Sequence, residues 1–152
     1  MSVTASTLVE KVALRRLGWV GLLAAVLSVA ANAVIRTIAK AAFEVPDGFQ
    51  PFTFGQFTFL TVAGVVGATL VLAFLGGLFK KAGRPIQRAR PIRSFRRLAV
   101  GALVLSWIPA LGLLAGRPYP GTTVQSVGTL MVMHTVTAVI TVGLLTTLGR
   151  ER

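Results

Sequence analysis

The feature that most constrains this chain is the length of its uncharged apolar runs. The clearest run extends from Phe54 to Phe79 without a charged side chain. A helix needs about 20 predominantly apolar residues to cross the roughly 30 Å of hydrocarbon in a bilayer. Of the 152 residues, 54% are hydrophobic and only 13% are charged. A soluble domain cannot bury so large an apolar fraction, so the sequence predicts an integral membrane protein.

Four such runs predict four transmembrane helices, approximately at residues 17–42, 54–79, 98–115 and 126–148. The first run is uncharged only as far as Ile35, and we expect its helix to continue past Arg36. Because hydrocarbon offers no partner to an unpaired backbone group, each run must be helical, including the fourth, which is rich in Val and Thr. We predict an all-α integral membrane four-helix bundle, a single domain over residues 1–152. The first run resembles a cleavable signal, because basic residues precede it and small residues end it. It exceeds the usual apolar core of about 7–15 residues, so we expect an uncleaved helix.

Basic residues are distributed unevenly along the chain. There are 16 Lys and Arg against 4 acidic residues, which gives a net charge of +12. Most of the basic residues lie in the two tails and in a loop at residues 80–97, whereas the opposite side of the membrane holds only Arg36, Lys40 and Arg117. Since cytoplasmic segments carry the excess of Lys and Arg, both termini are predicted to lie in the cytoplasm.

The basic 80–97 loop is predicted to contact anionic lipid headgroups, to which each basic residue near the surface contributes about 1 kcal/mol. Nucleic acid is not expected as a partner, because Pro85 and Pro91 interrupt the segment and prevent one continuous basic helix. The residues assigned to headgroup contact are Lys80, Lys81, Arg84, Arg88, Arg90, Arg93, Arg96 and Arg97.

Polar side chains inside a membrane are costly, so each one is a candidate functional residue. We predict that Asn32, Arg36, Gln56 and His134 line a small polar pocket open to the outer side. Three of them also have a structural interpretation. Asn32 can hydrogen-bond between helices, Arg36 can extend to the interface, and His134 can bond to a backbone carbonyl or a threonine.

Catalytic, metal and cofactor sites are not expected in this chain. It has no cysteine and one histidine, and its four acidic residues all lie outside the four uncharged runs. These residues cannot assemble an ordinary metal shell or a catalytic group with an orienting partner. We therefore predict a non-enzymatic protein without a cofactor.

Small residues in the second run predict a surface for close helix contact. Ala63, Gly64, Gly67 and Ala68 form two overlapping pairs of small residues four positions apart, a spacing that lets membrane helices approach closely. We expect this face to lie inside the bundle.

Three short patterns stand out in the second half of the chain. They are the basic stretch Arg90-Pro91-Ile92-Arg93-Ser94-Phe95-Arg96-Arg97-Leu98-Ala99, then Ser106 with Pro109, and then Leu130, His134 and Ala138. With these patterns the chain resembles a family of small, uncharacterised four-span bacterial membrane proteins of the actinobacterial type, over roughly residues 12–148. The resemblance implies the four-helix architecture and the bacterial plasma (inner) membrane, and it implies no activity.

Two functions are consistent with these observations. The sequence favours a structural or accessory subunit that packs against itself or against other membrane proteins, because small-residue faces are present and catalytic groups are not. The alternative is a small binding protein or transporter for a lipid or another apolar ligand, which would occupy the outer pocket. Membrane lipids are partners in both cases.

Overall fold

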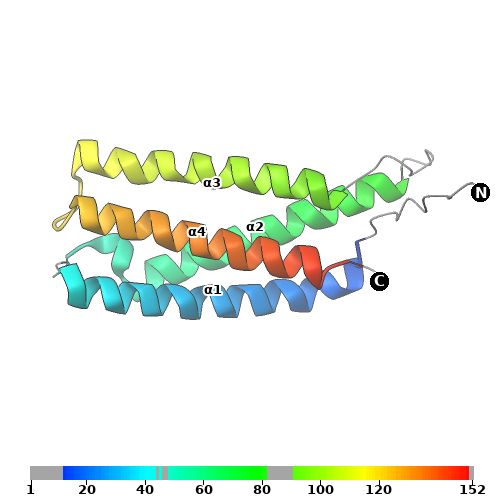
Figure 1. The fold of residues 1–152 in the computed structure, drawn as a ribbon, viewed down its shortest axis with the longest axis horizontal. Coiled ribbons are helices and arrows are strands. Elements are labelled where there is room, and N and C mark those ends of the chain that lie inside the picture. Colours follow the sequence, from blue (N-terminus) through cyan, green and yellow to red (C-terminus); the bar gives the residue numbers. More distant parts are fainter. Residues whose placement is uncertain (1–11, 44, 46–47, 82–90, 151–152) are drawn as a thin grey trace, which may run out of the picture.

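The structure, a computed structural model that describes residues 12–43, 45, 48–81 and 91–150, is a bundle of four long helices (Figure 1). Each long helix is apolar enough and long enough to cross a membrane. This confirms the predicted all-α fold with four candidate membrane spans. In chain order the elements are α1 (Leu14–Phe43), the short 3-10 helix η1 (Gln50–Phe52), α2 (Phe54–Lys81), α3 (Pro91–Gly116) and α4 (Val124–Thr147).

The start of α3 differs most from the prediction. The helix begins at Pro91 and not near residue 98. Counting uncharged residues finds only the most apolar part of a helix, whereas α3 continues through its basic turns because Ile92 and Phe95 are buried on one face. Pro91 suits the first helical position, where a missing N–H leaves no bond unmade.

The basic loop predicted at 80–97 is correspondingly shorter. Lys80 and Lys81 belong to the last turn of α2, and Arg93, Arg96 and Arg97 belong to the first two turns of α3. The remaining predicted headgroup contacts, Arg84, Arg88 and Arg90, lie outside the described residues.

The start of α4 is fixed by a reciprocal cap. The Thr123 hydroxyl accepts a hydrogen bond from the Ser126 backbone N–H at 3.1 Å, and the Ser126 hydroxyl accepts one from the Thr123 backbone N–H at 2.8 Å. Such a capping box satisfies two backbone donors that a helix start otherwise leaves unpaired. The helix therefore begins at Val124, slightly before the predicted residue 126.

The helices alternate in direction and pack in an uneven ring (Figure 1). α1 contacts α4 and α2 most extensively, and α3 lies mainly against α4. We call the end at which α1 begins and α4 ends the termini end, and the opposite end, which carries η1, the η1 end. At the termini end, α2 and α3 are joined through a buried cluster that includes Leu72 and Phe95.

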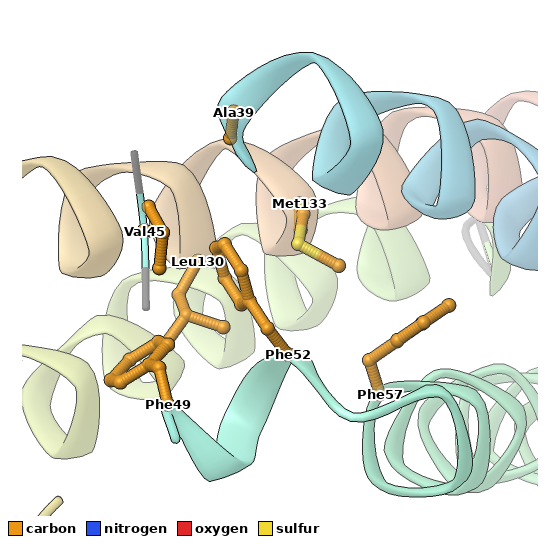
Figure 2. Close-up of a cluster of buried hydrophobic side chains, with 7 residues drawn as sticks. All are labelled: Ala39, Val45, Phe49, Phe52, Phe57, Leu130 and Met133. Atoms are coloured by element: carbon orange, nitrogen blue, oxygen red, sulfur yellow. The ribbon is translucent and has the colours of Figure 1, made fainter. Parts of the chain in front are cut away.

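The η1 end is closed by a second apolar cluster (Figure 2). The rings of Phe49 and Phe52 meet edge to face, with centroids 5.1 Å apart, and both are almost fully buried. Figure 2 shows them directed toward Leu130 and Met133 of α4. The segment around η1 therefore packs against the bundle and covers this end of it.

Three of the four residues in the predicted helix-packing face of α2 do not lie inside the bundle. Ala63, Gly64 and Gly67 are exposed, and a Cβ atom added at Gly64 or Gly67 would meet no atom within 4 Å in the described part of the chain. The fourth, Ala68, is half-buried and packs against the cluster that holds Leu72. Spacing alone could not show whether small residues face a helix, a cavity or lipid, and the structure differs from our expectation at the other three positions.

Because Gly67 faces open space, we expect Gly67→Leu to leave the stability of the isolated protein unchanged or slightly raised. A leucine favours the helical conformation over glycine by about 1 kcal/mol and is well accommodated among lipid chains. Thermal melting of the purified variant in detergent measures this. A melting temperature well below that of the parent would show that this face makes an internal contact.

Candidate functional site

A cavity of about 570 Å³ lies between α2, α3 and α4. α2 contributes Phe57, Leu60 and Gly64 to its wall, and α3 contributes Ala102 and Leu103. The cavity reaches the η1 end at Pro51 and Tyr119 and extends along the bundle as far as Ala68, Ala99 and Val142. The cavity lies toward the η1 end from the buried cluster that holds Leu72 of α2 and Phe95 of α3 near the termini end.

The cavity opens on the side of the bundle. Leu60 is 54% exposed, and Gly64, Ala102 and Pro109, which also line it, are exposed as well. These residues belong to the parts of α2 and α3 that are apolar enough to span a membrane. In a bilayer that these helices span, the opening would face the hydrocarbon region.

Asn32 forms the polar centre of the bundle next to this cavity. Its Nδ2 donates hydrogen bonds to the Thr61 hydroxyl on α2 and to the Thr137 hydroxyl on α4, each at 3.0 Å. The side chain is only 2% exposed, and all three residues line the cavity. Asn32 thus joins α1, α2 and α4, as the interhelical interpretation of the sequence requires.

His134 lies on the cavity wall with its ring orientation fixed. Nδ1 is 2.7 Å from the backbone carbonyl oxygen of Leu130, one turn earlier in α4. Since a carbonyl only accepts hydrogen bonds, Nδ1 must carry the proton and act as the donor. In the neutral ring, Nε2 is then an acceptor, and it has no hydrogen-bond partner among the residues the structure describes.

Three of the four predicted pocket residues, Asn32, Gln56 and His134, line the same cavity. This cavity opens on the side of the bundle, whereas the prediction had the pocket open to the outer side. Arg36 does not, and its Nε donates a hydrogen bond to the backbone carbonyl of Phe52 at 2.5 Å. The guanidinium therefore anchors η1 to α1. The structure therefore places Arg36 outside the cavity lining, because its side chain bonds to a loop carbonyl whose position the sequence could not give.

Sequence reasoning missed four polar residues of this region. Ser28 lies one turn from Asn32 on α1, and Thr141 lies one turn from Thr137 on α4. Because α1 and α4 are antiparallel and Asn32 pairs with Thr137, Ser28 and Thr141 belong to the next layer toward the termini end. The sequence did contain a signal for them, because α1 and α4 each carry polar residues four positions apart, which lie on one face of the helix. The missed residues are Ser28, Thr61, Thr137 and Thr141.

The match to a known family covers nearly the whole chain, from residue 10 to residue 151. The chain belongs to DUF6069, a family of unknown function. No curated protein and no solved structure matches it. Membership confirms the resemblance to an uncharacterised family, and the four long apolar helices identify this member of DUF6069 as a multi-pass membrane protein.

The termini end of this DUF6069 protein carries basic side chains in the described part of the chain. Arg93, Arg96 and Arg97 are exposed on the first turns of α3, and Arg150 is exposed just after α4. Arg96 Nη2 donates to the buried hydroxyl of Thr146 at 3.0 Å, which links α3 to α4. In the described residues, no three His, Cys, Asp or Glu side chains lie close enough to hold a metal ion.

Proposed function

We propose that this protein binds an apolar molecule, such as a lipid or another long-chain compound, inside the membrane, and that it does so without a catalytic step. The observation that carries the proposal is the cavity between α2, α3 and α4, which opens toward the hydrocarbon region. A chain from the bilayer could enter it sideways without crossing water.

The size and lining of the cavity support this function. Ligand pockets typically measure about 300–1,000 Å³ and combine a mainly apolar wall with a few placed polar groups. This cavity measures about 570 Å³, and most of its lining residues are apolar. Asn32, Gln56 and His134 supply polar groups at separate points of the wall.

The sequence favoured a structural or accessory subunit, and the structure gives that hypothesis less specific support. The exposed apolar faces of α2 and α3 suit lipid as well as they suit a protein partner. The cavity, in contrast, is a particular feature that a helix-packing role does not require. Ligand binding is therefore the better proposal, and assembly with itself or with other membrane proteins is the rival.

We further propose a location in the bacterial plasma membrane with both termini in the cytoplasm. The basic residues near the termini end support this orientation, because they would contact the anionic headgroups of the cytoplasmic leaflet. The resemblance noted from the sequence supports the bacterial membrane.

Binding can be tested with two probes of equal chain length, 1-hexadecanol and hexadecyl methyl ether. The protein is purified in an amine-oxide detergent, which has no hydroxyl group to compete, and titrated with each probe in native mass spectrometry. We expect saturable binding of one molecule per chain for at least one probe. Adducts that grow without saturation for both probes would contradict the proposal, and a particle that is always oligomeric and never binds either probe would favour the rival.

The orientation is tested by single cysteines at two exposed positions, Arg97→Cys and Gln125→Cys. Native cysteines do not interfere, because the chain has none. In intact cells, an impermeant thiol reagent should label the Gln125→Cys variant and should label the Arg97→Cys variant only after lysis. The reverse pattern would invert the proposed topology.

A further inference from the structure

Two buried polar atoms, in residues that line the cavity, lack a hydrogen-bond partner among the described residues. One is Asn32 Oδ1, in a side chain that is 2% exposed, and the other is Thr141 Oγ1, in a side chain that is 3% exposed. Both residues line the cavity. A buried polar group without a partner costs about 1–3 kcal/mol, so most such groups in proteins are paired.

The two atoms set requirements for a partner. The Asn32 amide oxygen only accepts, so the partner must donate a hydrogen bond. The Thr141 hydroxyl can donate or accept. A hydroxyl group meets both requirements because it donates one bond and accepts others, whereas an ether, an ester or a ketone oxygen cannot donate to Asn32.

A further polar atom lies along the wall at His134. With Nδ1 donating to the Leu130 carbonyl, Nε2 is the ring nitrogen that is left to pair with a ligand. The three residues lie within successive turns of facing helices, since Thr137, which Asn32 contacts, is one turn from both His134 and Thr141 in α4. This part of the wall therefore favours a donor in the ligand.

The kinds of residue that line the cavity also restrict the charge of the ligand's head group. The residues that line the cavity include no Asp, Glu, Lys or Arg in the described part of the chain. An unpaired charge in such surroundings is strongly disfavoured, so a carboxylate, phosphate or ammonium head group does not fit.

We infer that the cavity selects a neutral amphiphile with a free hydroxyl group, which hydrogen-bonds to Asn32 Oδ1 and Thr141 Oγ1. This inference rests on the proposed function and adds the chemistry of the head group to it. Long-chain alcohols and acylglycerols with a free hydroxyl belong to this class. Phospholipids and fatty acid anions do not.

The test compares dissociation constants for 1-hexadecanol, hexadecyl methyl ether and hexadecanoate at neutral pH. We expect 1-hexadecanol to bind about tenfold more tightly than the ether, as the loss of roughly one hydrogen bond implies. Hexadecanoate should bind more weakly than either. Equal affinities for the alcohol and the ether, or tightest binding of hexadecanoate, would overturn the inference while leaving the proposed function intact. Failure of all three probes to bind would overturn both.

Two matched variants test whether residues of the cavity wall cause the preference for the alcohol over the ether. Thr141→Val preserves shape and removes the unpaired hydroxyl, so the preference for the alcohol should fall below about threefold with no loss of thermal stability. Thr135→Val is the control, because the Thr135 hydroxyl already donates to the Met131 carbonyl at 2.8 Å and does not line the cavity. It should retain the tenfold preference.

Asn32→Leu is the second wall variant and should also lose the preference for the alcohol. An unchanged preference in both Thr141→Val and Asn32→Leu, or an equal loss in Thr135→Val, would overturn the assignment of the head-group site.

Discussion

Gly64→Phe should weaken binding of 1-hexadecanol at least tenfold, because the new ring would occupy the cavity. Gly64 lines the cavity near its opening, and a Cβ atom there meets no atom within 4 Å in the described part of the chain. The ring therefore has room to enter the space without disturbing the bundle. Titration in native mass spectrometry measures the change in affinity.

Gly67→Phe provides a matched control on the same helix. Gly67 is equally exposed and equally open, but it does not line the cavity. We expect this variant to bind 1-hexadecanol as the parent does.

Ala102→Phe repeats the test from α3, on the opposite wall, and should behave like Gly64→Phe. If both cavity variants bound the probe normally, or if Gly67→Phe lost binding to the same extent, the ligand could not lie between α2 and α3.

Gly149→Ala should destabilise the fold by about 3 kcal/mol, the upper part of the usual range for an overpacked site. A Cβ atom at this position would lie 2.3 Å from the Leu145 carbonyl oxygen and 2.9 Å from Leu17 Cδ2. The carbonyl belongs to the backbone of α4 and cannot move without disturbing the end of that helix. Gly149 also accepts a hydrogen bond from the Ala13 backbone N–H at 2.9 Å, so the start of α1 would be displaced with it.

Gly143→Ala is the control for this variant. Gly143 is an exposed position inside α4 with open space around it in the described residues. There, alanine should raise stability by up to about 1 kcal/mol through its helix propensity. Both variants can be compared by thermal melting in detergent. Equal melting temperatures for Gly149→Ala and the parent would show that the two ends of the chain do not pack as described.

The fold was largely predictable because the bilayer permits few alternatives. Uncharged runs long enough to cross hydrocarbon had to be helices, and four such runs predicted the four helices. Helix ends were less predictable. The basic first turns of α3 are held by burial of Ile92 and Phe95, which depends on neighbouring helices and not on the local run of residues.

The candidate site was also partly predictable from the properties of the bilayer. Asn32 and His134 stood out because polar side chains in a membrane are costly, and both lie on the cavity wall. Thr141 did not stand out, because a threonine normally satisfies its hydroxyl within its own helix, as Thr135 does. Whether such a hydroxyl is unpaired depends on side-chain geometry that a sequence pattern does not specify.

The small residues of α2 show where sequence spacing was a poor guide to helix packing. Their spacing predicted close packing, yet Gly64 borders the cavity and Gly67 faces outward. A smooth helix face permits a neighbouring helix to approach but does not attract one. Leu72 of α2 and Phe95 of α3 share a buried cluster near the termini end, and toward the η1 end both helices line the cavity.

The most direct test of the account is a crystal structure of the protein with a brominated long-chain alcohol, 16-bromohexadecan-1-ol. Anomalous scattering locates the bromine independently of any assumption about the ligand. We predict continuous ligand density that runs from a bromine peak between α2 and α3, at one end of the chain, to an alcohol oxygen within hydrogen-bond distance of Asn32 Oδ1 or Thr141 Oγ1 at the other end. Bromine peaks found only on the outer surface of the helices, with none between α2 and α3, would contradict the proposal that the cavity binds a ligand.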